Sequence, residues 1–530
     1  MPFIYMILGS MKAGFRLSSF IILFLPRLIW KGLPLLLSLW ALWHFREDDT
    51  QMLVMASLMC MSGVMIRHTG EKIAALIWKP STSHGSARFA SEAEVSVNNI
   101  FGGRGFLLGR LAGNLLRFSR EGHILTFAPT RSGKGAGGVI PNLIDHPGSC
   151  VVIDVKGENY AVTSRERAKR GAVYALAPFA ENIEPASFNP LDFIRLGTMH
   201  ETADAALIAD LIVVPHGENT YWDDEARNLI SALILYVANE MPGHMRTLGC
   251  VADIATTNKD ELGELITIMS AHQHPEIKSR AKALSQKEDK ERSGVISSAQ
   301  NHLAIWQSHK PLARASSRSD FRFQDLKNEP ATVYLSIPPE YLVVCRSFVR
   351  VMVGVAMASM TRSTKRPKYR VLFLLDEVAA LGHLKVLEEA IGYIAGYGVT
   401  LWLFFQDMAQ LEKTYRKWRS IVANCAVRQA FNVADAQTAK ELSALLGVTT
   451  VDVETEGKSA SFPFSLLPHS VHRGTMKSSR PLMTEDEVMA LPTKKQLLFV
   501  QGMRPILADK IRYFDRWEWS FWGKWDKWQD

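Results

Sequence analysis

The segment GHILTFAPTRSGKG, residues 122–135, places a short apolar strand directly before a loop of small residues and a lysine. A helix is expected to follow from about Ala136. In such a loop, backbone N–H groups and the positive end of the helix dipole hold phosphate groups, and the lysine ammonium bridges the outer phosphates. The layout predicts an α/β fold that binds phosphates through Thr130, Arg131, Ser132, Gly133, Lys134, Gly135 and Ala136.

The loop departs twice from the usual GxxxxGK[ST] pattern. Ala128 replaces the first glycine, and Gly135 replaces the hydroxyl residue that normally holds Mg²⁺. Taken alone, the segment could be an ordinary glycine-rich turn between a strand and a helix. A second motif favours the phosphate-binding interpretation.

That second motif is YRVLFLLDE, residues 369–377, an apolar run that ends in two carboxylates. In a Walker B strand of this form, Asp376 would hold Mg²⁺ through water, and Glu377 would orient or deprotonate the attacking water. The alternative is a buried strand whose acidic end caps the next helix. With a phosphate loop upstream, we favour the Walker B interpretation.

Two further strands are expected to end near the same phosphates. Residues 399–405 are apolar and are followed by Gln406, which could report whether a γ-phosphate is present. A solvated strand end is the alternative for Gln406. Residues 150–153 form another apolar run, followed by the charged sequence DVKGE. Alternation of such strands with helices is typical of a parallel α/β sheet.

The first 80 residues differ from the rest because they contain two apolar runs, 17–43 and 52–66. We interpret them as a transmembrane hairpin. The second run would give a helix of about 22 Å, so flanking residues must help it cross a hydrocarbon core of about 30 Å. Basic residues flank the hairpin and its loop is mostly acidic, which predicts both termini in the cytoplasm. A cleaved signal peptide, the alternative, requires only one apolar run.

Composition narrows the class of protein further. A chain of 530 residues is long enough for two to four domains, and its net charge of +8 weakly favours anionic partners. The five cysteines lie far apart and form no CxxC pair, so neither a zinc site nor a disulfide framework is indicated. The soluble part is expected to be cytosolic.

The motifs in series resemble one family, the type IV secretion coupling proteins, which are the TraG/TraD-like ATPases of conjugation and effector export. The matching segments are GSARFA (85–90), TRSGKG (130–135), DVKGE (154–158), SFNPL (187–191), YWDDEAR (221–227), LDE (375–377), residues 397–406 and RPLM (480–483). In the closest branch the loop commonly ends Gly-Lys-Gly. The resemblance thus implies that Gly135 is no defect, and that Asp376, the phosphates and water hold Mg²⁺.

The resemblance implies a RecA-like P-loop NTPase motor with an inserted all-α domain, preceded by the two-helix transmembrane hairpin. It also implies a ring of six subunits below the bacterial inner membrane, with the motor in the cytoplasm and ATP and Mg²⁺ as cofactors. Between residues 197 and 317 the strand signal gives way to helical periodicity. The expected divisions are 1–80 (hairpin), 81–196 (first nucleotide-binding segment, with the phosphate loop), 197–317 (insertion), 318–516 (second nucleotide-binding segment, with Walker B) and 517–530 (tryptophan-rich tail).

Several features leave alternatives open. In RecA-like rings a neighbour's arginine can complete the site, and Arg419 and Arg428 are the candidates, with Arg428 preferred because its segment is apolar. The basic run within residues 278–292 is interspersed with acids, which favours a solvated helix face over a phosphate contact.

Residues 454–480 are polar and irregular, which predicts a long loop. The tail, with tryptophans at 517, 519, 522, 525 and 528, could dock on a partner or membrane, or fold back on the motor.

The predicted function is an inner-membrane ATPase that recruits relaxosome DNA or effector proteins and drives them into a secretion channel. One alternative is a receptor platform that does not hydrolyse ATP, which the departures in the loop suggest. Against it stand Lys134, Asp376, Glu377 and Gln406 together. Another alternative is a chromosome-type DNA translocase. The sequence does not indicate whether the cargo is DNA, protein or both.

Overall fold

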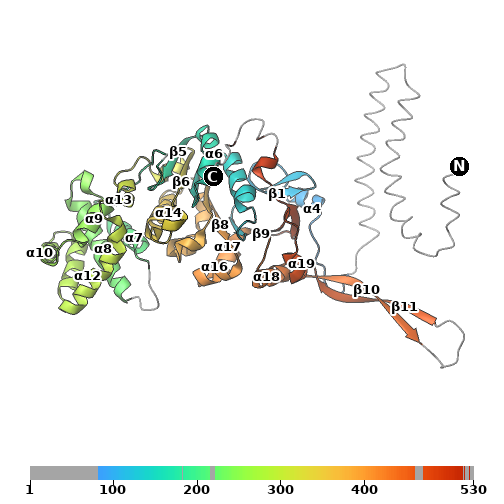
Figure 1. The fold of residues 1–530 in the computed structure, drawn as a ribbon. Helices are drawn as coiled ribbons and strands as arrows, with labels where there is room; N and C mark the ends of the chain where they lie inside the picture. Colours follow the sequence, from blue (N-terminus) through green and yellow to red (C-terminus); the bar gives the residue numbers. More distant parts are fainter. Residues whose placement is uncertain are drawn as a thin grey trace, which may run out of the picture. The chain divides into compact units, whose positions relative to one another are not determined.

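The computed structural model describes residues 82–181, 183–214, 221–459, 470–516, 519 and 525. The described residues fall into two units, the larger of which runs from Ala87 to Val451 and continues from Ser479 (Figure 1). The predicted transmembrane hairpin of residues 1–80 lies outside the described residues. Within the described part of the chain, no helix combines the length and the apolar character needed to cross a bilayer.

The larger unit is built on an eleven-stranded mixed sheet, in the order β2-β1-β13-β12-β9-β3-β8-β7-β4-β6-β5. Seven adjacent strands are parallel: β9 (Cys425–Phe431), β3 (His123–Phe127), β8 (Val399–Phe405), β7 (Val371–Leu375), β4 (Cys150–Ile153), β6 (Ala331–Leu335) and β5 (Ala172–Leu176). The inner strands of this block are almost wholly apolar and buried, as expected when helices cover both faces of a parallel sheet.

Four antiparallel strands extend this block beyond β9, which the sequence-based expectation of a parallel sheet did not include. They are β12 (Lys495–Val500), β13 (Ile506–Asp509), β1 (Phe106–Leu111) and β2 (Asn114–Phe118). A buried polar network joins the two halves of the sheet. Thr126 donates to Gln429, and the amide nitrogens of Gln429 and Gln496 both donate to the carbonyl oxygen of Leu108. Each of these polar side chains is thereby satisfied within the core.

Helices cover the faces of the sheet. The phosphate loop leads into a π-helical turn η1 (Gly135–Val139) and then α5 (Ile140–Asp145). The long helix α14 (Arg346–Thr361) is buried over most of its length, since its sequence is apolar nearly all round. The other helices that belong to this part of the chain are α4 (Glu92–Val97), α6 (Glu158–Ala168), α15 (Lys385–Ala390), α16 (Met408–Thr414), α17 (Trp418–Asn424), α18 (Ala436–Leu446) and α19 (Glu485–Met489).

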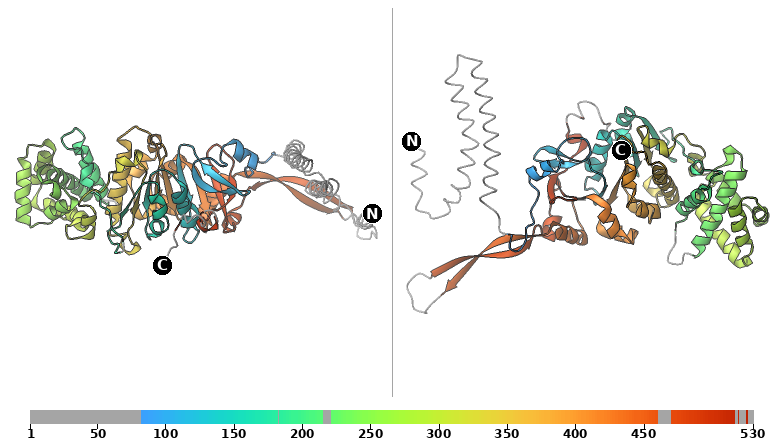
Figure 2. Two further views of the ribbon diagram at one scale, coloured as in Figure 1. Left: turned by 90° about the horizontal axis from the view of Figure 1, so that it is seen from above. Right: turned by 180° about the vertical axis from the view of Figure 1, so that it is seen from behind.

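The described residues between 197 and 317 form helices and contain no strand. The helices are α7 (Glu201–Ile212), α8 (Tyr221–Glu240), α9 (Leu248–Ala255), α10 (Lys259–Ser270), α11 (Pro275–Ser285), α12 (Asp289–Leu303) and α13 (Pro311–Ala315) (Figure 2). The basic run extends over α11, the turn that follows it and α12. Arg280 on α11 pairs with Glu276, and Lys287 in the turn pairs with Glu291. This pairing supports the interpretation as a solvated helix face. The domain boundaries themselves stay a prediction.

The prediction of a long loop at residues 454–480 is wrong. The described residues of this stretch belong to two paired strands, β10 (Val448–Ser459) and β11 (Ser470–Pro481). A two-stranded ribbon satisfies its backbone hydrogen bonds between the strands and needs no buried apolar face. The polar composition of both strands therefore concealed the pairing from a search based on apolar alternation.

Two tryptophans of the C-terminal tail fall within the described residues, and both fold back on the larger unit. Trp519 is buried in a small core with residues of α5 and β1, and Trp525 packs against the same cluster. The ring of Trp525 lies 5.0 Å from that of Tyr513, edge to face. Of the two interpretations left open for the tail, these contacts support folding back for Trp519 and Trp525.

Candidate nucleotide site

Three neighbouring parallel strands carry the predicted site residues at the same edge of the sheet. Strand β8 lies between β3 and β7, with Leu403 paired to Leu125 on one side and to Leu375 on the other. The phosphate loop leaves β3, Gln406 follows β8, and Asp376 follows β7. Because the carboxyl ends of parallel strands meet at one edge, residues far apart in sequence converge there.

The phosphate loop turns tightly between Pro129 and the helix. The Ser132 N–H donates to the Pro129 carbonyl over 3.1 Å, and the Gly137 N–H donates to the Gly133 carbonyl over 2.8 Å. Arg131 and Gly133 adopt left-handed conformations, with φ of +64° and +84°. The glycine takes this conformation without strain. The Ser132 hydroxyl is buried and has no hydrogen-bond partner in the described part of the chain, as expected of a loop shaped for a ligand.

Lys134 lies between the two carboxylates predicted from the Walker B motif. Its Nζ donates to the Asp376 carbonyl over 3.0 Å and lies 3.3 Å from both Asp376 Oδ1 and Glu377 Oε2. Burial alone would lower the pKa of Lys134, but the attraction of Asp376 and Glu377 outweighs it and raises that pKa. The lysine is therefore charged and positioned beside both acids.

Asp376 has an environment that suits a cation ligand. Burial raises the pKa of Asp376, and the charge of Lys134 offsets part of this effect. Its Oδ1 pairs with Lys134 but accepts no hydrogen bond from the described residues. A carboxylate oxygen that is buried and short of donors gains from a divalent cation, which prefers oxygen ligands. On this observation the residues present fit Mg²⁺.

Of the polar residues that follow β8 and β4, Gln406 is a candidate site residue, whereas Asp407 and Asp154 hold the starts of helices. Gln406 is half-buried, and its N–H donates to Gln410 Oε1 over 2.8 Å. Asp407 caps α16 by accepting from the Gln410 N–H over 2.7 Å, so its role is structural. Asp154 holds the start of α6 by accepting from the Tyr160 N–H over 2.8 Å, and burial raises the pKa of Asp154 to about 7.

The two candidate arginines lie at different places in the fold. Arg428 is half-buried in the middle of β9, where its neighbours are Leu125 in β3 and Phe499 in β12. Arg419 is exposed on α17, with its guanidinium 4.9 Å from the ring of Trp418. The contacts within one chain do not test which arginine enters a neighbour's site, so the preference for Arg428 stays a prediction.

Lys510, which no sequence pattern indicated, contacts the phosphate loop. Its Nζ donates to the Ser132 carbonyl over 2.9 Å and also to the side-chain oxygen of Asn432. It lies 4.7 Å from the ring centre of Phe431. Burial, with a smaller contribution from Arg512, lowers the pKa of Lys510 to about 8. This lysine restrains the loop from a segment near the end of the chain.

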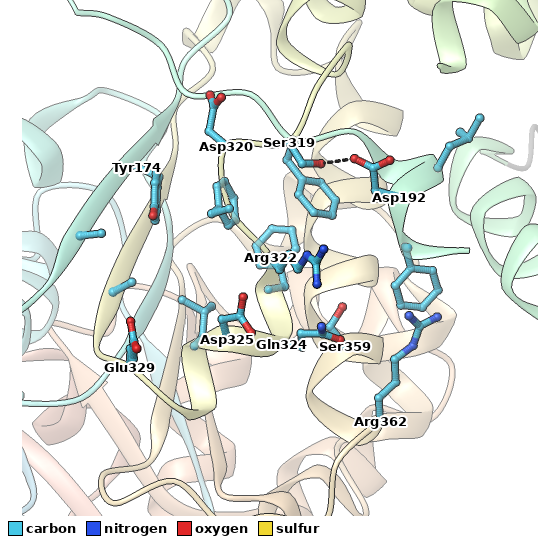
Figure 3. A pocket seen from close by; sticks show the side chains of 18 of the residues that line it. Tyr174, Asp192, Ser319, Asp320, Arg322, Gln324, Asp325, Glu329, Ser359 and Arg362 are labelled. Atoms are coloured by element: carbon cyan, nitrogen blue, oxygen red, sulfur yellow. Dashed lines mark hydrogen bonds between the residues drawn. The ribbon is translucent and has the colours of Figure 1, made fainter. Parts of the chain in front are cut away.

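A large cavity lies elsewhere in the unit (Figure 3). It has a volume of about 1150 Å³, and its lining includes Ala172 and Ala331, the first residues of β5 and β6. Arg322 and Arg362 also line it, while Ser319 donates to Asp192 over 2.6 Å at its wall. The phosphate loop leaves the opposite, carboxyl edge of the parallel strands. The cavity is therefore not part of the candidate nucleotide site.

Comparison with known proteins identifies the family. The family model described as type IV secretory system conjugative DNA transfer matches residues 78–529. The conjugal transfer protein TraG of Escherichia coli is 34% identical over 441 residues, covering 75% of this chain and 68% of TraG.

Solved structures show the same fold. The plasmid coupling protein TrwB in complex with the ATP analogue ADPNP is 16% identical, with a TM-score of 0.60 and coverage of 80% of this chain and 93% of TrwB. TrwB in complex with ADP and Mg²⁺ is likewise 16% identical, has a TM-score of 0.58, and covers 80% of this chain and 94% of TrwB. Together with the family match and the TraG relationship, the fold leads to one conclusion. The chain belongs to the type IV secretion coupling proteins of conjugative DNA transfer.

Proposed function

We propose that the protein is an inner-membrane ATPase that couples DNA or protein substrates to a type IV secretion channel. One observation carries the proposal. Lys134 of the phosphate loop contacts both Asp376 and Glu377 at the carboxyl edge of the sheet, although they are 242 and 243 residues away in sequence. A phosphate-loop lysine and two acids that meet at one edge of the sheet are groups that ATP hydrolysis uses. TraG, a conjugal transfer protein, supports the transfer role.

ATP would bind along the loop from Thr130 to Ala136, with backbone N–H groups on its phosphates. Lys134 would turn from the carboxylates to the β- and γ-phosphates, and Asp376 would hold Mg²⁺ through water. When bound, Mg²⁺ neutralises charge on the phosphates. Glu377 would orient or deprotonate the attacking water, and Gln406 would report the γ-phosphate. TrwB, a protein of this fold, is known with ADPNP and with ADP and Mg²⁺, which supports this choice of ligands.

We further propose the assembly and location that family membership favours. Residues 1–80 would anchor the chain in the bacterial inner membrane as a two-helix hairpin, with the motor in the cytoplasm. Six subunits would form a ring with the nucleotide between neighbours, and Arg428 of one subunit would reach the site of the next. Residues 197–317 would form an all-α domain inserted between nucleotide-binding segments 81–196 and 318–516. The cargo would be relaxase-bound DNA, effector proteins or both.

The proposal is tested by transfer of a mobilisable plasmid and of a reporter-fused effector. Donor cells would carry wild type, Lys134→Ala or Glu377→Gln at matched membrane levels. Lys385→Ala and Glu389→Gln are matched controls, because both side chains are exposed on α15 and 62% and 56% accessible. We expect both site variants to abolish transfer and both controls to retain it. Whichever cargo the wild type moves identifies the substrate class.

The competing function, a platform that binds substrates without hydrolysing ATP, makes the opposite prediction. Transfer would persist in Lys134→Ala and in Glu377→Gln cells. Purified wild-type protein would also show no phosphate release above that of Lys134→Ala. Either result would replace the ATPase with the platform.

A further inference from the structure

The segment that directly follows Glu377 is held by two arginines of helix α14. It forms a short 3₁₀-helix, η7 (Val378–Leu381), and then turns at Gly382. Arg346 Nε donates to the Ala380 carbonyl over 3.0 Å, and Arg350 Nη1 donates to the Leu381 carbonyl over 3.4 Å. Arg350 Nη1 also donates to the carbonyl oxygen of His383. The position of Glu377 therefore depends on a segment that α14 fixes through backbone hydrogen bonds.

Arg350 also bonds to a second, distant segment. Its Nε donates over 3.2 Å to the carbonyl of Leu211, in the last turn of α7. The side chain is only 4% exposed, and a buried guanidinium must find acceptors to offset its lost hydration. Here those acceptors are carbonyls from two places, one beside the catalytic carboxylates and one in the helical segment. The planar guanidinium of Arg350 joins these two segments.

Helices α14 and α7 are packed so closely that they should move together. Gly354 of α14 faces Leu211, and a Cβ atom at Gly354 would lie 2.3 Å from Leu211 Cδ2. At the end of α14, Arg362 Nη2 lies 2.8 Å from Asp204 Oδ2 on α7. Arg362 is also stacked 3.4 Å above the ring of Phe193, at the wall of the cavity in Figure 3. The two helices are thus joined at both ends of their contact.

The link continues into α8 through a motif to which the proposed hydrolysis gives no role. Arg227, the last residue of YWDDEAR, places its Nε 2.9 Å from Asp210 Oδ1 on α7. Asp210 precedes Leu211, the residue whose carbonyl binds Arg350. A continuous set of polar contacts therefore runs from the segment after Glu377, through Arg350, to α7 and α8.

We infer that Arg350 is a positioning residue that couples the catalytic carboxylates to the helical segment. It holds the residues after Glu377 in the place that hydrolysis requires, and it does so only while α7 stays packed on α14. A substrate that displaces α7 would therefore change the rate of the chemical step. This inference rests on the proposed ATPase, because it assigns Arg350 a role in that reaction.

The test compares ATP turnover by purified full-length wild type, Arg350→Met, Arg350→Lys, Arg346→Gln and Arg362→Met. Misplacing a catalytic group by about 1 Å can cost about 100-fold in rate. We expect Arg350→Met to lower kcat by about 10- to 100-fold, with KM for ATP changed by less than about threefold. Arg350→Lys should recover part of kcat, and Arg346→Gln should lower it less than Arg350→Met. Arg362→Met should keep kcat within about threefold of wild type.

Arg362→Met is the matched control, since it removes an arginine–acid contact at the far end of α14 and leaves in place the bonds from Arg350 to Leu211 and to the segment after Glu377. Equal losses of kcat in Arg350→Met and Arg362→Met would overturn the inference and leave Arg350 a packing role. A wild-type kcat in both Arg350→Lys and Arg346→Gln would also overturn the inference. If Arg350→Met does not fold, these two variants test the positioning role of Arg350 in its place. Absence of turnover in wild type would refute the proposed ATPase itself, and the inference with it.

Discussion

Replacement of Glu377 by glutamine should affect ATP binding and ATP hydrolysis differently. Glu377 pairs with Lys134 in this structure, whereas in the proposed reaction it contacts the attacking water. In this structure its Oε2 lies 3.3 Å from Lys134 Nζ, and the two side chains are 24% and 25% exposed. Lys134 must leave this pair to reach the phosphates of ATP. A partly exposed ion pair of this kind contributes about 0.5 to 1 kcal/mol. Glu377→Gln removes that competition while keeping the shape of the side chain.

Two effects of opposite sign are therefore expected from Glu377→Gln. The affinity for ATP should increase about two- to fivefold, which is the equivalent of about 0.5 to 1 kcal/mol. The kcat for hydrolysis should fall at least about 100-fold, because a neutral amide neither accepts a proton nor orients water as a carboxylate does. Binding is measured by titration with a fluorescent ATP analogue, and hydrolysis by phosphate release under saturating ATP.

Lys134→Met provides the contrast for this experiment. It should lose ATP binding, since the ammonium that contacts the phosphates is gone, whereas Glu377→Gln should keep it. If Glu377→Gln weakened ATP binding as much as Lys134→Met, Glu377 would serve in binding rather than in chemistry. If Glu377→Gln hydrolysed ATP at the wild-type rate, the assignment of Glu377 as the residue that activates water would be wrong.

Three further predictions concern Lys510, Gly171 and His123. Lys510→Met should raise KM for ATP about fivefold, equivalent to about 1 kcal/mol for one lost charged hydrogen bond, without changing kcat. The pKa of Lys510 in the folded state is about 8, below its ordinary value of 10.5. Between these two pH values the unfolded chain binds more protons than the folded one, so the stability of wild type relative to Lys510→Met should rise with pH. Gly171→Ala should lose more than about 2 kcal/mol in urea unfolding because its Cβ would overlap the Pro330 carbonyl, whereas Gly243→Ala, which meets open space, should stay within about 0.5 kcal/mol. His123 is buried and neutral with a pKa of about 4, so the free energy of unfolding should fall by up to about 3 kcal/mol between pH 6.5 and 4, and His123→Gln should flatten this dependence.

Part of the candidate nucleotide site was predictable because each residue of that part stands at the end of an apolar strand. Lys134, Asp376 and Gln406 follow runs that only a buried parallel strand explains, and the carboxyl ends of such strands share one edge. Their convergence thus follows from the strand pattern, with no contact information. The direct contact of Lys134 with both carboxylates agrees with this reasoning.

The residues that sequence reasoning missed lack such a pattern. Lys510 lies outside any motif, and it reaches the phosphate loop because β13 runs antiparallel to β12 and returns the chain to that edge. Arg350 belongs to an apolar helix, where a single arginine resembles a chance interruption. Its role depends on carbonyl groups of Leu211 and Leu381, and backbone acceptors carry no sequence signal. The contacts of Lys510 and Arg350 thus follow from the tertiary structure and have no counterpart in the sequence pattern.

The antiparallel extension of the sheet has a consequence for how the chain is made. Strand β1 is synthesised early, yet its partner β13 comes about 400 residues later, as the register of Arg110 with Asp509 requires. Strand β9 is likewise synthesised before its partner β12. While the ribosome is still elongating, these strands present unpaired backbone edges that favour association with other chains. A nascent chain stopped before residue 495 should thus depend on chaperones, and a premature stop codon should yield an aggregating product rather than a smaller working motor.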